Sequence, residues 1–587
     1  MTAVRAASPR LRRSIRIASI ALGSVVGLAL AAMVGGVISS ALAARSNLEA
    51  VFPMVATLQT SVLHGDTETA REAADSIAEK TAAAAAAVHN PLWDAAEGVP
   101  VVGQNLAAIR IAAEVSDSIA RDAILPAAGI RLDAFQPVSG RIDIAAIRDT
   151  QPLVDAALAA VVSARDRLAD IDTLALAGPV ASPVLQLDAQ LRDIQPMLES
   201  LATAAQVMPD ALGADAPRHY LLMFDNNAEL RTQGGNPAAL ALVTIDAGAI
   251  AIQQQLPGSL IPAATAPVAP VSSEEQALFG NSLGTVMSST TSVPDFATTA
   301  VMAKALWEAA FDTDIDAVVM VDPRALAYVL EALGPVPIAA DESITATNVV
   351  DILLRDSYSR FATADEQDAF FTGVTASVFV AVATGQGSFV ALVDRLVAAV
   401  DEGRIRMWSA DAVEQGIFEA GPIGGEFRAD TPAESRIGVF LNDRTGVKLG
   451  YYLDATIVAE ADRCNAEDAP VTVTVDLTST LPVGEVLPQS QVSDAYPGGA
   501  MRVEVAVYGP EGSTVGDVSV NADPVDAAFD GIHHGRPVIM VPVTIPAAGA
   551  VTIAVSFESG DAELGALRVD TTPMVRPVPV EVLDVHC

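Results

Sequence analysis

Lysine is nearly absent from this chain of 587 residues, in which it occurs only at Lys80, Lys304 and Lys448. Lys and Arg together number 34 against 72 Asp and Glu, which gives a net charge of −38. A nucleic-acid-binding protein needs Lys and Arg to neutralise phosphates, so this balance excludes a nucleic-acid partner. It also excludes a polybasic attachment to lipid head groups. A negative surface does favour solubility and attracts cations such as Mg²⁺.

Cysteine is also scarce, with only Cys464 and Cys587 in the sequence. Both fall at the boundaries of a strand-rich C-terminal region. A disulfide between them would close a long loop and stabilise this region by roughly 4–5 kcal/mol. Disulfides persist outside the cytoplasm. We therefore predict this bond, and two unpaired thiols are the alternative.

Common catalytic motifs are missing as well. The sequence has no Walker A loop, no strand-linked G-x-G-x-x-G and no H-E-x-x-H. His533 and His534 could bind zinc together with His586 and Cys587, but adjacent histidines in a turn are usually solvated.

Charge is absent from residues 17–44, and residues 1–16 carry five arginines and no acidic side chain. A bilayer core needs roughly 20 apolar residues of helix, so this run predicts a transmembrane anchor. The arginines predict an N-terminus inside the cytoplasmic membrane and an ectodomain outside it. A cleaved signal peptide is the alternative, since Ala41-Leu42-Ala43 resembles a cleavage site, but signal-peptide apolar regions usually run about 7–15 residues.

The order of the remaining segments predicts a multidomain α+β protein. Alanine-rich stretches interrupted by prolines predict helices, alternating strands and helices predict an α/β domain, and many short strands separated by Pro and Gly predict a β-sandwich. The predicted strands of the α/β domain include His219–Phe224, Ala239–Ile245 and Ala317–Val321, and residues 257–295 read as a surface loop or lid. The boundaries are a basic cytoplasmic tail 1–16, an anchor 17–44, a helical region 45–210, an α/β domain 215–433 and a β-rich domain 434–587.

One loop in the α/β domain combines charged and flexible residues. Asp225 to Gly235 reads D-N-N-A-E-L-R-T-Q-G-G between two predicted strands. Gly234 and Gly235 would let backbone amides approach an anion, and Arg231 is the cation of the loop. A guanidinium beside glycine amides suits phosphate or pyrophosphate. The alternative is that Arg231 pairs with a nearby carboxylate and only holds the loop.

This loop and several later motifs resemble a bacterial family catalogued as domain of unknown function 4012. The similar features occur in order between about residues 90 and 460. They are N-N-x-E-x-R-x-x-G-G within 226–235, Asp246 with Gly248, Pro91-Leu92-Trp93, residues 100–105, Asp316–Asp322, Leu333-Gly334-Pro335-Val336, Asn442, Lys448, Tyr451 and Tyr452.

The middle portion is distantly similar to the LytR–CpsA–Psr phosphotransferases, which attach glycopolymers from a polyprenyl pyrophosphate carrier to peptidoglycan. Their first arginine motif falls on Arg231-Thr232-Gln233, with Gln233 in place of an aspartate. A later arginine helix falls on 352–360 and keeps Arg355. The following motif loses both arginines, because Glu366, Gln367 and Asp368 stand there.

Two functions follow from these resemblances. The first is an extracytoplasmic cell-envelope protein that binds a cell-wall glycopolymer, a polyprenyl-linked precursor or a partner without catalysis. The alternative is a Mg²⁺-dependent phosphotransferase, and Mg²⁺ is the one cofactor that this alternative implies. Its expected residues are Arg231 and Asp246 for catalysis, Asp225 and Asp322 for the metal, and Arg231, Gly234, Gly235, Arg355 and Lys448 for the anion.

Overall fold

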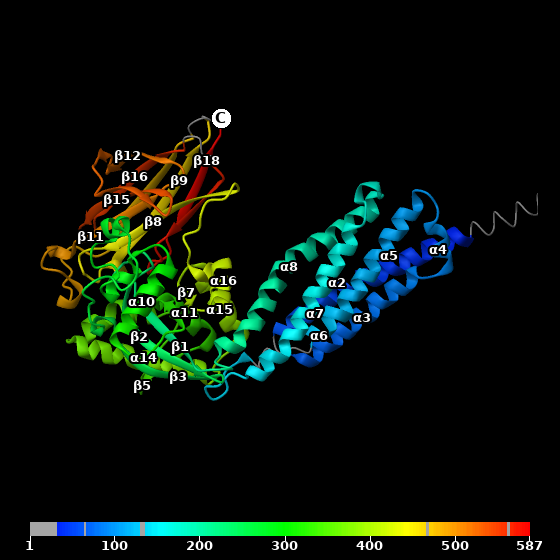
Figure 1. Cartoon of the computed structure of the whole chain (residues 1–587), viewed down its shortest axis with the longest axis horizontal. Coiled ribbons are helices and arrows are strands. Elements are labelled where there is room, and N and C mark those ends of the chain that lie inside the picture. Colours follow the sequence, from blue (N-terminus) through cyan, green and yellow to red (C-terminus); the bar gives the residue numbers. More distant parts are fainter. Residues whose placement is uncertain (1–31, 64–65, 129–134, 465–468, 560–563, 587) are drawn as a thin grey trace, which may run out of the picture. The chain divides into compact units, whose positions relative to one another are not determined.

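A computed structural model describes residues 32–586 except 64–65, 129–134, 465–468 and 560–563. The chain divides into two compact units (Figure 1). The described parts of 1–135 and of 145–208 form a helical unit, and 136–144 with the described parts of 209–587 form a mixed unit of helices and sheets.

The helical unit contains a helix over 32–49 followed by several longer helices. Side-chain caps define where two of these helices begin. The Asp66 side chain accepts a hydrogen bond from Thr69 N at the start of the helix Thr67–Val88. Asn90 caps the helix Pro91–Glu97, in which Trp93 is completely buried. After the helix over 32–49, the helical elements are α2 Val51–Leu63, α3 Thr67–Val88, α4 Pro91–Glu97, α5 Val102–Ile119, η1 Ala120–Ile124, α6 Leu125–Ala127, α7 Ile144–Ala169, η3 Thr173–Ala175 and α8 Gly178–Ala211.

The structure contradicts the predicted N-terminal transmembrane helix. Among the described residues, no helix combines the length and the apolar character that crossing a bilayer requires. Residues 17–31 of the predicted span lie outside the described part of the chain. Residues 32–44 belong to the helix over 32–49, where Met33, Val37, Ala41 and Ala44 pack against a core that includes Trp93. Their spacing of three or four residues is that of a helix face buried against neighbouring helices.

The mixed unit begins with a five-stranded sheet in the order β3-β2-β1-β4-β7. β1 (Arg218–Asn226) pairs in parallel with β4 (Ala317–Val321) and antiparallel with β2 (Asn236–Asp246). β3 (Ala249–Pro257) and β7 (Ile405–Ser409) form the edges. The strands predicted at His219–Phe224, Ala239–Ile245 and Ala317–Val321 are confirmed.

Helices cover both faces of this sheet. α10 (Phe296–Ala310) packs on one face around the buried Trp307, and α11 (Pro323–Leu333), α14 (Ala364–Ala383) and α15 (Phe389–Asp401) lie over the other. The smaller elements are η4 Gly258–Leu260, α9 Ser273–Phe279, η5 Met287–Ser292, β5 Val336–Ala339, β6 Glu342–Ile344, α12 Val349–Asp351, η6 Ile352–Asp356, α13 Ser357–Arg360, α16 Ala412–Ala420 and η7 Pro422–Gly424.

Within the segment 257–295, residues 261–272 form neither helix nor strand, as expected of a loop, whereas the part from residue 273 onward is packed. It contains α9, whose Leu278 and Phe279 are buried, and η5, whose Thr290, Thr291 and Ser292 are buried. These polar side chains and carbonyls hydrogen-bond to the chain around Gly235, which is why a Ser/Thr-rich sequence can lie inside the fold.

Two further sheets form a β-sandwich that starts at Glu434, with the orders β13-β12-β16-β10-β9-β18 and β14-β15-β11-β8-β17. Alternating apolar residues of both sheets build one large core. The strands are β8 Glu434–Asp443, β9 Leu453–Asp462, β10 Val471–Ser479, β11 Met501–Tyr508, β12 Thr514–Val520, β13 Asp523–Pro524, β14 Phe529–His533, β15 Arg536–Ile545, β16 Ala550–Glu558, β17 Ala566–Thr571 and β18 Val580–Val585, with η8 Gly450–Tyr452, η9 Gln489–Gln491 and η10 Pro497–Gly499 between them.

Candidate functional site

An apolar cavity of about 270 Å³ lies between the five-stranded sheet and the helices α11, α14 and α15. Its origin is visible in the alternation of side chains along the strands. On β1, Leu221 and Met223 face the α10 side, whereas Leu222 and Phe224 line the cavity. This volume is close to the lower end of the roughly 300–1,000 Å³ that small-molecule sites occupy.

Side-chain size on β2 leaves the space open. Leu240 and Leu242 pack in the core under α10, while the alternate residues Ala239 and Ala241 face the cavity with small side chains. The cavity extends along β2 from Ala238 to Val243, which corresponds to roughly 17 Å of strand at about 3.4 Å per residue. Its lining also includes Ile252 of β3, Val321 of β4 and Ile405 of β7, so the cavity extends across the whole sheet as well.

The opposite wall is one face of α14. Its cavity-lining residues recur at three- and four-residue spacing, as expected for a single helix face. They are Phe371, Val374, Thr375, Val378, Phe379 and Val382. Val380 of the same helix is 58% exposed and does not line the cavity.

Polar groups gather where β1 and β4 end. Because these strands are parallel and Phe224 pairs with Val321, the residues that follow, Asp225 and Asp322, lie at the same edge of the sheet. Both line the cavity. The sequence analysis assigned these two carboxylates to one metal site, and the sheet topology brings them to the same edge.

Asp322 is fully engaged by its neighbours. Its Oδ1 caps α11 by accepting from Ala325 N at 2.7 Å, and its Oδ2 accepts from Arg404 Nη1 at 2.9 Å and from Asn227 Nδ2 at 3.1 Å. Arg404 is itself 3% exposed and also donates to the Met574 carbonyl. Burial lowers the pKa of Arg404, but the Asp322 and Glu402 carboxylates outweigh this effect and hold it above its usual value.

Asp225 has a different environment. It is 3% exposed, and within the described residues neither carboxyl oxygen has a hydrogen-bond partner. Burial, followed by the nearby Asp322 carboxylate, raises its pKa well above the usual value, and the Gly235 amide and Arg231 offset this only in part. Burial therefore favours the protonated form of Asp225, which can donate a hydrogen bond.

Tyr358 completes the polar edge of the cavity. Its hydroxyl accepts a hydrogen bond from Asn226 Nδ2 at 2.7 Å, and Asn226 Oδ1 accepts from Ala228 N at 3.0 Å. Burial raises the pKa of Tyr358, which stays protonated.

The two aspartates do not fit a Mg²⁺ site. Mg²⁺ prefers ionised carboxylates with free oxygen atoms. Asp322 already accepts three hydrogen bonds, one of them from the Arg404 guanidinium, so its oxygen atoms are not free. No step through a metal is therefore derived for this site.

Arg231 lies in the joint between the sheet and the sandwich. Its Nη1 donates to the carbonyls of Leu230 at 2.7 Å and Asp443 at 3.0 Å, and its Nε donates to Ser288 O at 3.3 Å. The guanidinium thus satisfies backbone carbonyls of three segments. Arg231 therefore holds the loop in place, as in the alternative to an anion site, but its partners are backbone carbonyls and not carboxylates.

The two glycines of the loop serve close backbone packing. A Cβ on Gly235 would lie 2.4 Å from the Asn226 carbonyl group, so only glycine fits there. Gly234 has φ +126, and a Cβ there would lie 3.3 Å from Pro573 O.

The other predicted anion ligands pair with carboxylates. Lys448 forms an ion pair with Glu229, and Arg355 pairs with Asp351 at 3.2 Å and Asp356 at 2.7 Å. Asp246 is exposed at the far end of β2, next to the start of β1, and is separated from Asp225 by the length of the strand.

The same loop inserts into the sandwich. Leu230 is completely buried in the sandwich core, and Thr232 exchanges two hydrogen bonds with the Asn442 side chain. Gly450 N donates to Ala228 O at 2.8 Å. Residues that are separated by more than 200 positions in the sequence therefore meet at this joint.

Comparison with protein families gives one match. Residues 215–358 match the family model described as "Protein of unknown function (DUF4012)". This segment belongs to the DUF4012 family. It includes β1, the loop at Asp225–Gly235, β4 and Tyr358, so the resemblance predicted from these motifs is confirmed there. A similarity to the LytR–CpsA–Psr enzymes is not among these findings. No curated protein and no solved structure matches the chain.

Two residues of the site were not predicted from the sequence. Tyr358 and Arg404 become site residues only through contacts with distant parts of the chain. The cavity-facing alanines did leave a signal, because Ala239 and Ala241 alternate with leucines in β2.

The structure describes one of the two cysteines of the predicted disulfide. Cys464 is disulfide-bonded. Cys587, the other cysteine of the sequence, lies outside the described residues.

Proposed function

We propose that the mixed unit binds an apolar, chain-like ligand with a neutral head group, such as a polyprenyl alcohol, without catalysing a reaction on it. The observation that carries this proposal is the apolar cavity between the five-stranded sheet and α14. Apolar pockets with a few convergent polar groups are the usual form of small-molecule sites.

The polar edge of the cavity favours a neutral head group. Asp225 carries a proton and can donate a hydrogen bond to a hydroxyl or carbonyl oxygen of the ligand. Arg404 is already paired with Asp322 and Glu402, and Arg231 donates to backbone carbonyls. An anionic head placed here would lie beside two carboxyl groups without a free cation to compensate its charge.

We further propose that the protein works outside the cytoplasm, in the cell envelope. The disulfide at Cys464 supports this location, because disulfides persist in oxidising compartments. The strongly acidic composition suits a soluble exported region.

The proposal is tested by displacing a fluorescent apolar probe from the full-length protein with farnesol. Val378→Trp places a large side chain in the cavity, and Val380→Trp makes the same change on the exposed face of the same helix. We expect farnesol to bind the parent and Val380→Trp alike and to bind Val378→Trp at least about tenfold more weakly. Equal affinity for all three folded proteins would contradict the proposal.

Farnesyl pyrophosphate, with and without Mg²⁺, separates the two functions that follow from the sequence. Binding no tighter than that of farnesol supports the neutral-head account. A preference of tenfold or more for the pyrophosphate that depends on Mg²⁺ would favour the phosphotransferase alternative instead.

A further inference from the structure

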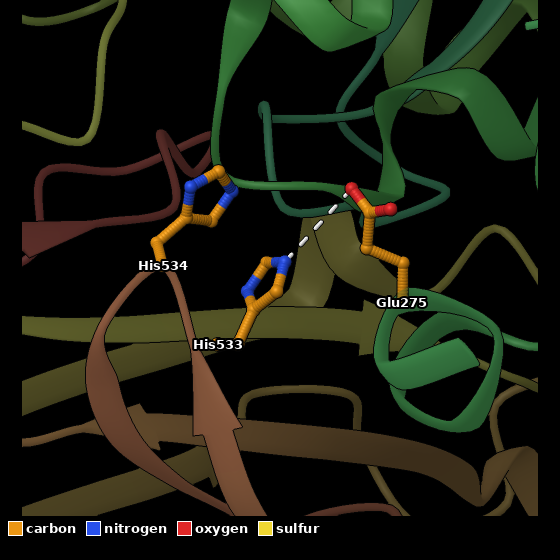
Figure 2. Close-up of side chains that lie close together, drawn as sticks. All are labelled: Glu275, His533 and His534. Atoms are coloured by element: carbon orange, nitrogen blue, oxygen red, sulfur yellow. Dashed lines mark ion pairs between the residues drawn. The ribbon is translucent and has the colours of Figure 1, made fainter. Parts of the chain in front are cut away.

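Two histidines and a glutamate from distant parts of the chain converge outside the cavity. Glu275 comes from α9, His533 ends β14, and His534 begins the turn that leads into β15 (Figure 2). One ligand atom from each of the three side chains can be chosen so that all lie within 4.8 Å of one another.

His533 is oriented by its surroundings. It is 6% exposed, its Nδ1 lies 2.9 Å from the hydroxyl of the fully buried Tyr508, and Phe279 contacts the ring edge at a centroid distance of 5.7 Å. These contacts fix the ring and leave Nε2 on the side of Glu275, as Figure 2 shows. A hydrogen bond at the second nitrogen is the usual arrangement of a metal-binding histidine.

The Nε2 atom of His533 has no hydrogen-bond partner among the residues described. Glu275 Oε1 lies 3.9 Å away, which is too far for a hydrogen bond. Two atoms at this separation can share an ion, because Zn²⁺ lies about 2.0–2.2 Å from nitrogen and carboxylate oxygen ligands. Burial, and then the neighbouring His534, lower the pKa of His533 to about 4, so its ring is neutral, the form that binds metals.

The backbone places the other two groups. His533 pairs with Arg536 across a two-residue turn in which His534 has φ 51 and Gly535 has φ 73. Two successive positive φ values are those of a type I′ hairpin, a turn that more often begins with asparagine. Glu275 is held by a capping box, since its Oε2 accepts from Ser272 N at 2.7 Å while its Oε1 faces His533.

We propose that Glu275, His533 and His534 bind a divalent cation of the class that prefers imidazole, with Zn²⁺ as the expected ion. Three protein ligands would leave a fourth position for water. The ion would join α9 to the β14–β15 hairpin, two segments separated by more than 250 residues. The sequence had suggested His586 and Cys587 beside the histidine pair; the structure brings Glu275 to the pair, and Cys587 lies outside the described residues.

The proposal is independent of the apolar cavity. Untagged full-length protein is treated with a chelator and titrated with ZnCl₂ by calorimetry, with bound zinc counted by elemental analysis. We expect one zinc per chain, and at zinc concentrations about 100 times the Kd a rise of about 5 °C in the unfolding temperature. MgCl₂ is expected to give neither effect.

Two variants preserve the local structure while removing ligands. Glu275→Gln keeps an oxygen for the capping box, and His534→Asn suits the positive φ of the turn. Each is expected to weaken zinc binding at least tenfold, while His586→Asn, at an exposed histidine away from the cluster, leaves it unchanged. No zinc binding by the parent, or equal binding by the parent and both ligand variants, would overturn the proposal.

Discussion

Asp225 and Asp322 follow neighbouring parallel strands, yet only Asp322 has a cation, Arg404, at hydrogen-bonding distance. The pair therefore divides into one carboxylate that caps α11 and pairs with Arg404, and one acid with a raised pKa that faces an apolar cavity. A shared edge of the sheet gives both groups their place, and their different partners give them different environments.

The neutral state of Asp225 predicts a pH-dependent effect of Asp225→Asn. The folded pKa lies above the unfolded value of 3.8, so the unfolded chain releases the proton first as pH rises. The parent then loses stability as pH rises from 3.8 toward the folded pKa, whereas the asparagine variant does not titrate. The variant should gain up to about 1.4 kcal/mol per pH unit relative to the parent within this window.

Thermal unfolding of both proteins between pH 5 and pH 8 measures this difference. Asp246→Asn, at an exposed position of β2, is the matched control and should keep a constant difference from the parent. A constant difference for Asp225→Asn as well would show that Asp225 is ionised in the folded protein.

Arg404→Met should be strongly destabilising. It removes the one cation at hydrogen-bonding distance from the buried Asp322 carboxylate, and loss of one partner of a buried ion pair costs about 3–5 kcal/mol. Arg395→Met, which removes an arginine of α15 that pairs with Asp394 and with Glu331 of α11 at the surface, should have only a small effect. Urea denaturation compares the two, and similar costs would contradict the assigned role of Arg404.

Leu230→Ala tests the joint between the sheet and the sandwich. Leu230 is completely buried in the sandwich core, so truncation should lower the free energy of unfolding by about 2–5 kcal/mol. Leu260, which is 66% exposed, gives the control Leu260→Ala with an expected change within about 0.5 kcal/mol. A loss below about 1 kcal/mol for Leu230→Ala would mean that the loop is not anchored in the sandwich.

The sequence predicts the local elements of this fold better than their contacts. Apolar runs bounded by polar turns correctly located β1 and β4, because strand patterning depends on neighbouring residues. The role of Arg231 depends on Ser288 and Asp443, which are distant in the sequence, and no local pattern records their carbonyls. Its position near Gly234 and Gly235 therefore suggested an anion site, although in the structure Arg231 donates to backbone carbonyls.

The N-terminal helix shows the same limit. An uncharged run such as residues 17–44 has the composition of a membrane span, but composition does not reveal which apolar face has a partner. Met33, Val37 and Ala41 pack against other helices, and that pairing requires tertiary structure. The walls of the cavity also depend on tertiary structure, since alanines of β2 face α14 there.

Photo-crosslinking with a diazirine-bearing farnesol analogue tests the central claim most directly. Irradiation of the full-length protein followed by peptide mass spectrometry locates the bound chain. We predict labelled residues within 222–243 and 371–382, the two walls of the cavity, with labelling suppressed by unlabelled farnesol. Labelling confined to other segments, such as the exposed apolar residues of the helical unit, or labelling that excess farnesol does not suppress, would contradict the account.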